Sequence, residues 1–516
     1  MTARVSRAAA IALTGLDGTT VHVEAAVSNQ LPGISIIGLP DAALAEAKQR
    51  VKLATQQAQL PLTDRFLVIN LSPAALPKHG SGFDLAIALA ALAASSRVPD
   101  TRLTDIAHIG ELGLDGGLRR PPGLLSSVLA AKKLGFARVM VPESCAGEAA
   151  LVPDIEVIAA ATLRGAAAWH SGTTEGWRVV AQVKPHELCA AKLNTELDIA
   201  DVIGQPEAVE ALVVAAAGRH HLSMVGPPGA GKTLLASRLA SLLPDLGPEE
   251  SLEASSIASL DGSPLTELVR RPPFVSPHHT ASKVSIIGGG DSRGVRPGAI
   301  TRASHGVLFL DEAPEFPAKV LDSLRQPLES GSVEIHRAHL RTVMPAHMQL
   351  VLAANPCPCG FADSPDAANA CTCTPHQKIR YLGRLSGPLL DRIDLRLQIR
   401  RVSSVLVNSD ESPRPTSAQL RERVALARTR AAHRLRDTPW RVNAEVRGEW
   451  LRAPANRLPR SATAVLDTAL AQGSLTVRGY DRALRLAWTL SDLAEKPMPE
   501  RAEIRSALIL RGGASV

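Results

Sequence analysis

A glycine-rich segment contains the residue types that point most directly to a chemistry. It fits the pattern G-x-x-x-x-G-K-[ST] in full, with an apolar strand predicted before it and a helix after it. In such a loop glycines let backbone N–H groups turn toward phosphates, and the next helix adds its N-terminal dipole. The predicted phosphate-binding residues are Gly226, Pro227, Pro228, Gly229, Ala230, Gly231, Lys232 and Thr233.

Two side chains of this loop and two acids further along the chain predict a site for a nucleoside triphosphate with Mg²⁺. Lys232 should reach the β- and γ-phosphates, and the Thr233 hydroxyl should bind Mg²⁺. A run of four apolar residues, 307–310, then delivers Asp311 and Glu312. We expect Asp311 to hold Mg²⁺ and Glu312 to orient or deprotonate the attacking water.

A third apolar strand, 350–354, ends in a polar residue, Asn355. Its amide could hold the attacking water or the γ-phosphate. Taken alone this is a weak signal, because strand ends often carry Asn as a turn residue. It gains weight from its position after the acid-bearing strand.

Four of the six cysteines fall within seventeen residues, in two C-x-C pairs. Four thiolates can close a tetrahedral Zn²⁺ site of structural type, although this spacing is tighter than the usual C-x2-C. The alternatives are reduced free thiols or a redox pair. The candidate zinc ligands are Cys357, Cys359, Cys371 and Cys373, with His376 as a spare.

Composition indicates a folded protein of about three domains, given 516 residues of which 45% are hydrophobic and 21% charged. The longest apolar run is too short to cross a membrane, and the N-terminus is a poor signal peptide, so we expect a cytoplasmic protein. The net charge is +7, and residues 376–516 carry 26 basic against 14 acidic residues. Such an excess suggests a polyanion such as nucleic acid, or a coding bias toward Arg.

The elements that position these residues fall into an α/β pattern. Residues 1–172 predict an α+β or mixed domain, and residues 173–196 a linker. A nucleotide-binding α/β core follows over residues 197–401, a Ser- and Pro-rich linker over 402–418, and a helical lid over 419–516. The predicted strands are 21–27, 66–71, 139–141, 155–158 and 221–225, and the predicted helices are 41–57, 84–94, 206–217 and 233–243.

The three strand ends, in this order, resemble the AAA+ ATPases. Further segments resemble the Mg-chelatase-like ATPases of the YifB/ComM family over essentially the whole chain; they are 277–280, 288–290, 297–298, 305–312, 355–360 and 385–394. The resemblance implies a hexameric motor and, in ComM-type members, helicase and branch-migration activity on DNA during natural transformation.

The resemblance also implies arginines that sense or complete the nucleotide site. Arg392 is similar to the trans-acting arginine finger of chelatase motors, with Arg384 as a rival. The plain alternative for Arg392 is a surface ion pair with Asp391 or Asp394. In the lid, Arg478 is similar to the second sensor, with Arg482 close behind.

Two insertions could bind DNA through its phosphates, without reading sequence. In related helicases, hairpins at these places line a central pore. Solvated loops are the equally weighted alternative. The first insertion, 285–297, carries Arg293 and Arg296; the second, 333–343, predicts a hairpin with Arg337, His339 and Arg341.

The N-terminal domain resembles the Lon-protease fold. Alignment of the segments puts Gly82 at the serine position and Ser127 at the lysine position, so neither catalytic group is present. A shifted dyad of Ser81 and Lys78 would be unusual. We therefore predict a non-catalytic scaffold.

Three functions remain open from the sequence. The first is an ATP-driven DNA motor of ComM type. The second is a chelatase-like motor that remodels a protein partner, and the third is an ATP-dependent switch with little turnover. The N-terminal domain and the cysteine cluster favour the first over the second, and intact catalytic groups count against the third.

Overall fold

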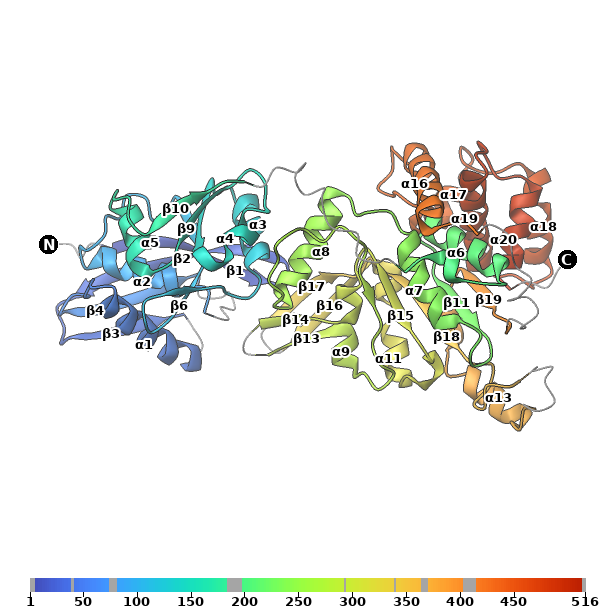
Figure 1. Cartoon of the computed structure of the whole chain (residues 1–516), viewed down its shortest axis with the longest axis horizontal. Helices are drawn as coiled ribbons and strands as arrows, with labels where there is room; N and C mark the ends of the chain where they lie inside the picture. The colour runs from blue at the N-terminus through green and yellow to red at the C-terminus, as the bar shows by residue number, and fades with distance from the viewer. Residues whose placement is uncertain are drawn as a thin grey trace.

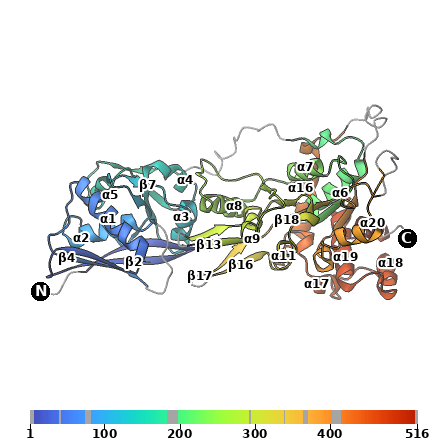
Figure 2. The same ribbon diagram turned by 90° about the horizontal axis from the view of Figure 1, so that it is seen from below.

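The computed structural model describes residues 5–38, 41–73, 81–182, 197–291, 294–337, 340–362, 370–401 and 414–512. The chain is elongated, with an N-terminal α/β body at one end and C-terminal helices at the other (Figure 1). A second α/β body lies between them, and the turned view shows the same linear order (Figure 2). The fold class is therefore α/β with a helical C-terminal part, as the sequence predicts.

The N-terminal body is built on an eight-stranded mixed sheet in the order β10-β9-β8-β5-β1-β2-β4-β3. Its predicted strands and helices are all present. Its strands are β1 Val5–Thr14, β2 Asp17–Ser28, β3 Gly33–Ile37, β4 Phe66–Ser72, β5 Ile106–His108, β8 Arg138–Pro142, β9 Glu156–Ala160 and β10 Trp177–Val180. A separate small ribbon pairs β6 Glu111–Leu112 with β7 Leu118–Arg119, and the helices are α1 Asp41–Gln57, α2 Asp84–Ala94, α3 Leu124–Lys133, α4 Ala146–Ala149 and α5 Leu163–His170.

Helix α2 is the core of this body because it is apolar on all sides. Its one acid, Asp84, is buried and receives two hydrogen bonds from Arg50, at 2.7 and 3.2 Å. Burial raises the pKa of Asp84 to about 6 against the opposing charge of Arg50. At the other end of the sheet, β10 lies inside the stretch 173–196 that the sequence predicts as a linker, so the sheet extends into it.

The central body contains a parallel five-stranded sheet in the order β12-β15-β18-β11-β19. All carboxyl ends of a parallel sheet meet at one edge, so residues that follow different strands are brought together there. The strands are β11 Leu222–Val225, β12 Phe274–Val275, β15 Val307–Leu310, β18 Gln349–Ala354 and β19 Leu395–Gln398. Around them lie α6 Pro206–Gly218, α7 Lys232–Leu242, α8 Pro248–Leu260, α9 Lys283–Ile287, α10 Ala299–Arg302, α11 Ala318–Ser323, α12 Pro327–Ser330, α13 Pro375–Leu382 and α14 Gly387–Leu390.

Two antiparallel hairpins extend this body toward the N-terminal one (Figure 2). The first pairs β13 Gly288–Asp291 with β14 Gly294–Pro297, and the second pairs β16 Ser332–Arg337 with β17 Leu340–Pro345. The second hairpin is where the sequence predicts one. The N-terminal turn at Gly15 lies close to this second hairpin, because a Cβ at Gly15 would come within 2.4 Å of Thr342 Oγ1.

The two α/β bodies are joined through α3 and α8. The Ser259 hydroxyl on α8 donates to Glu148 Oε1 at 2.7 Å and accepts from the Leu125 backbone of α3 at 3.2 Å. Arg120 donates to both oxygens of Glu148, at 2.7 and 2.9 Å, and also to Ser263 O. Glu148 is only 3% exposed, so the junction contains a buried and fully paired carboxylate.

The C-terminal helices pack on α6 and α7 and share one apolar core with them. They are α16 Ser417–Arg434, α17 Gly448–Arg452, α18 Arg460–Ala471, α19 Val477–Leu493 and α20 Arg501–Leu510. Among the residues that the structure describes, we find no helix with the length and apolar character needed to cross a membrane.

Candidate functional site

The glycine-rich loop joins β11 to α7 at the carboxyl edge of the central sheet. Gly229 and Gly231 have φ values of +74° and +85°, in the left-handed region that favours glycine. Gly226 lies so close to β19 that a Cβ would come within 2.3 Å of Ile399 O. The loop therefore requires glycine at these positions, and α7 begins directly behind it at Lys232.

The Lys232 ammonium points into this loop. It donates to Gly226 O at 2.6 Å, to Pro227 O at 3.0 Å and to the side-chain oxygen of Asn355 at 3.0 Å. Burial lowers the pKa of Lys232, and the charges of Asp311 and Glu312 oppose this shift. The strand-end amide of Asn355 thus lies beside the phosphate-binding lysine.

The Thr233 hydroxyl donates to Asp311 Oδ2 at 2.7 Å. The contact forms because β15, which carries Asp311 at its end, and β11 are separated only by β18 in the parallel sheet. A hydroxyl and a carboxylate this close are hard oxygen ligands of the kind Mg²⁺ prefers. The pair fits the magnesium site that the sequence predicts.

Glu312 has a different environment from Asp311 although the two are adjacent. Its backbone is left-handed, with φ +49°, and its side chain is half exposed. His279 Nδ1 lies 3.3 Å from Glu312 Oε2, on the segment that follows β12. With His278, Asp311 and Glu312, His279 lines a cavity of about 270 Å³. No role for His279 was predicted from the sequence; the available signal was its place in the segment 277–280.

Arg392 lies at the opposite edge of the sheet from the loop. It precedes β19, and residue 398 of that strand pairs with Val225 just before the loop. At about 3.3 Å per residue the separation along the sheet is about 20 Å. The Arg392 guanidinium is buried, donates to Pro388 O at 2.6 Å and forms an ion pair with Glu329. The partner is therefore neither Asp391 nor Asp394.

The rival Arg384 is placed differently. It donates to Pro314 O at 3.1 Å and to Glu315 Oε2 at 3.0 Å, in the turn that follows the two acids. Arg384 is thus bonded to its own chain near the carboxyl edge, whereas Arg392 is bonded to its own chain near the amino edge.

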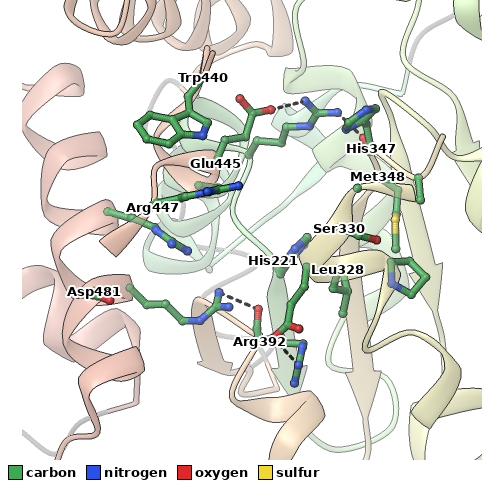
Figure 3. A pocket seen from close by; sticks show the side chains of 18 of the residues that line it. His221, Leu328, Ser330, His347, Met348, Arg392, Trp440, Glu445, Arg447 and Asp481 are labelled. Carbon is green, nitrogen blue, oxygen red and sulfur yellow. Dashed lines mark hydrogen bonds and ion pairs between the residues drawn. The ribbon is translucent and has the colours of Figure 1, made fainter. Parts of the chain in front are cut away.

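Arg392 lines an arginine-rich cavity of about 520 Å³ (Figure 3). One wall comes from the amino-terminal edge of the central sheet, and the other comes from the C-terminal helices, which carry Arg447 and Asp481. This cavity was not predicted from the sequence, because it forms only where α19 packs beside the start of β19. The arginines that line it are Arg219, Arg392, Arg447, Arg478, Arg482 and Arg485.

Arg478 and Arg482 are distinguished by their contacts. Arg482 donates to Asp394 Oδ1 at 2.6 Å and to Arg392 O at 2.9 Å. Burial opposes the ionisation of Asp394, but the charge of Arg482 and a contact with His220 hold its pKa well below the usual range. Arg478 is exposed, and we find no hydrogen bond or ion pair between it and any residue that the structure describes. Arg478 is thus the one available to a ligand.

The four cysteines of the predicted metal site lie together. All four sulfurs are within 4.8 Å of one another. The separations from Cys357 Sγ are 3.3 Å to Cys359 and 3.7 Å to Cys371, and Cys359 lies 3.6 Å from Cys371. A tetrahedron of four sulfurs about 2.3 Å from zinc has edges of about 3.8 Å. The donor set therefore fits Zn²⁺.

The predicted DNA contacts are only partly described. Arg296 lies on β14, and the side chain of Arg341 on β17 is 72% exposed, 3.6 Å from Glu334. Arg293, His339 and the Arg337 side chain lie outside the described part.

In the N-terminal body, at the position where a Lon-type site would have its lysine, the Ser127 hydroxyl donates to Gly123 O at 3.0 Å, and Ser127 is buried. Lys78 lies outside the described residues, whereas the Ser81 hydroxyl donates to Glu111.

Three family models match the chain. Residues 198–406 match "Magnesium chelatase, subunit ChlI". Residues 23–145 match "Subunit ChlI of Mg-chelatase", and residues 414–511 match "Magnesium chelatase, subunit ChlI C-terminal". The matches cover all three parts of the fold.

Relatives align over nearly the whole length. An uncharacterised protein of Mycobacterium tuberculosis is 45% identical over 98% of both chains. The uncharacterised protein YifB of Escherichia coli is 37% identical, over 97% of this chain and 96% of its own. The competence protein ComM of Haemophilus influenzae is 38% identical, over 93% of this chain and 92% of its own.

Proposed function

The chain belongs to the YifB/ComM family of magnesium-chelatase-like AAA+ ATPases, and on that premise we propose that it is an ATP-driven motor acting on DNA. The observation that carries the proposal is the convergence of Lys232, Thr233, Asp311 and Asn355 at one edge of the sheet. Each comes from a different strand end or from the helix behind the loop. Such a set positions a triphosphate and its metal ion rather than a small apolar ligand.

Within the proposed site each group has one task. The loop backbone and Lys232 bind the phosphates, while Thr233 and Asp311 would hold Mg²⁺, which would neutralise negative charge on the phosphates. Glu312 orients the attacking water and accepts its proton. Asn355 fixes Lys232 through their 3.0 Å contact and is positioned to bind the γ-phosphate.

The trans-acting arginine follows from the two edges of the sheet. Arg392 cannot reach the loop of its own chain, about 20 Å away along the strands. A head-to-tail ring would place the arginine-rich cavity of one protomer against the loop of the next. We therefore assign Arg392 as the arginine finger and Arg478 as the second sensor, both acting on the neighbour's nucleotide in a ring that we take to be a hexamer.

DNA is the proposed substrate of the motor. The basic excess in residues 376–516 and the exposed Arg341 on the β16–β17 hairpin support phosphate contacts without sequence reading. The relative named competence protein ComM supports a role in DNA recombination during natural transformation. The activity proposed is helicase or branch migration.

Zinc is a further cofactor in this proposal. Four thiolates leave no open coordination position, so the ion would have a structural role and no part in hydrolysis. The proposed cofactors are therefore ATP, Mg²⁺ and Zn²⁺.

An alternative substrate is a protein. The matches to the magnesium chelatase subunit support this reading. The nucleotide site itself would be the same for a DNA substrate and for a protein substrate. The two readings differ only in what stimulates ATP hydrolysis, which makes them separable by one assay.

The assay is ATP hydrolysis by the full chain with no DNA and with single-stranded, double-stranded and branched DNA, each titrated with salt. A DNA motor should be stimulated by at least one of these DNAs. The stimulation should fade as salt rises, because phosphate contacts release counterions. Turnover that no DNA stimulates would favour a protein substrate, and negligible turnover throughout would contradict the motor.

A further inference from the structure

The loop that carries the cysteine cluster is physically joined to the phosphate-binding loop. We call residues 355–362 with 370–373 the cysteine knuckle. Its first residue, Asn355, accepts the hydrogen bond from Lys232 at 3.0 Å. Two residues later Cys357 is fully buried, and its sulfur accepts a hydrogen bond from the Ala362 backbone at 3.3 Å. Backbone N–H groups directed at sulfur are a common feature of metal-binding thiolates.

A second contact lies at Gly360, which packs on Pro228 in the middle of the phosphate-binding loop. A Cβ at Gly360 would come within 2.6 Å of both Pro228 Cδ and Cγ. Arg401 completes the contact, because it donates to Pro228 O at 3.0 Å and its guanidinium lies 5.9 Å from the Phe361 ring. The knuckle therefore touches the loop both at its lysine and at its central proline.

The sulfur geometry favours a metal over disulfides. The three separations of 3.3, 3.7 and 3.6 Å all exceed the 2.05 Å of an S–S bond but approach the edge of a zinc–thiolate tetrahedron. Each of these three sulfurs takes part in two of the contacts, which a pairwise disulfide arrangement does not produce.

We propose that the four cysteines bind one Zn²⁺ and that this ion holds the knuckle against Pro228 and Lys232, so that zinc occupancy sets the affinity for nucleotide. The proposal rests on the proposed function in one respect, the assignment of the loop to a nucleotide. Without the metal, nothing covalent fixes residues 371 and 373 to residues 357 and 359. The 355–361 segment then loses its support, and the loop loses its preformed shape.

The first experiment measures zinc content and nucleotide affinity in the purified full chain. We expect one zinc per chain by elemental analysis. The double variant Cys371→Ser/Cys373→Ser should lose the zinc and bind a fluorescent ADP analogue about tenfold or more weakly, as expected for a displaced binding group. Cys145→Ser is the control, since this buried cysteine lies in the N-terminal body, away from the knuckle.

A second variant separates the contact from the metal. Gly360→Ala keeps all four ligands but adds a methyl group against Pro228, at a position with φ +83°. Zinc should be retained while nucleotide affinity falls. Gly172→Ala is the matched control, because its φ is also positive at +77° and a Cβ there meets nothing within 4 Å. This comparison remains valid even if the double cysteine variant does not fold.

The outcomes are distinct. A folded chain without zinc would overturn the metal site. Loss of zinc with unchanged nucleotide affinity, or equal effects of Gly360→Ala and Gly172→Ala, would overturn the coupling. A zinc-containing chain that binds no nucleotide at all would contradict the proposed function and the coupling together, while the metal site would stand.

Discussion

Asp311 and Glu312 are neighbours in the chain but are held by different partners. Asp311 accepts a hydrogen bond from Thr233 at 2.7 Å, which fixes it beside the phosphate-binding loop. Glu312 faces the cavity shared with His279, on a left-handed backbone that turns its side chain away from that contact. This difference supports the proposal that metal binding and water activation fall to separate carboxylates.

This division predicts the behaviour of Glu312→Gln. The variant should bind ATP with nearly unchanged affinity, because the phosphate and Mg²⁺ contacts remain, but its turnover should fall by about 10²–10⁴-fold with the loss of the base. Binding of a fluorescent ATP analogue and steady-state hydrolysis measure the two effects. Glu315→Gln, three residues on, is the control. Comparable loss of binding in Glu312→Gln would show that Glu312 is misassigned.

Substitution of Arg482 and of Arg478 should affect the stability of the protein differently. Arg482→Ala leaves the buried Asp394 carboxylate without its main partner and should lower the free energy of unfolding by about 3–5 kcal/mol. The pKa of Asp394 is depressed in the fold, so its stabilisation is present above its unfolded pKa of about 3.9 and is lost as pH falls further. Denaturation at pH 7 therefore reports the full effect.

Arg478→Ala is the comparison for that measurement. Arg478 is exposed, so its removal should leave stability within about 0.5 kcal/mol while reducing ATP turnover. Equal destabilisation by the two substitutions would show that Arg478 is also structural.

At the scale of elements, the junction of α3 and α8 fixes the N-terminal body to the ATPase body. Its buried carboxylate, Glu148, is satisfied by Arg120 and Ser259. Helix α3, which would carry the lysine of a Lon-type site, thus packs against α8 of the ATPase body. This supports the proposal of a non-catalytic scaffold.

Removing Arg120 should loosen the junction. Arg120→Ala leaves Glu148 buried without its cation, a change that costs about 3–5 kcal/mol in other proteins. We expect calorimetry to show a separate, earlier transition for one body and limited proteolysis to cut first near the junction. Arg138→Ala, which breaks an exposed pair with Glu156, is the control and should change little. A single unchanged transition in Arg120→Ala would contradict this role.

The sequence predicted the elements better than their arrangement. The phosphate-binding loop and the strands before Asp311 and Asn355 are local patterns, and the structure has them at those positions. The arginine-rich cavity could not be predicted, because α19 and β19 are about 80 residues apart and meet only through tertiary packing. The Arg120–Glu148 pair was missed for the same reason, since surface and buried charges look alike in sequence.

At the scale of the whole molecule, the nucleotide loop and Arg392 occupy opposite edges of one sheet. Arg392 lies too far from the loop of its own chain to reach it, and it is paired with Glu329 of that chain. A head-to-tail contact would bring the two together. Hydrolysis should therefore depend on assembly.

Mixing two inactive variants tests this dependence. Lys232→Ala disables the loop and Arg392→Ala disables the finger, so each alone should have little turnover. In a random equal mixture, about a quarter of the contacts would join an intact loop to an intact finger and should recover a matching share of activity. Absence of recovery in co-purifying mixed assemblies would mean that Arg392 does not act on its neighbour.

The elongated shape and the placement of the two half-sites have a further consequence. On the proposed role of Arg392, an open row of such chains would have one protomer whose loop receives no arginine and another whose Arg392 has no nucleotide to act on. Only closure removes both vacancies at once. Each chain added to an open row would therefore complete one active site, whereas closing the ring would complete one more without adding a chain. The ATPase activity per chain would then report whether the ring is closed.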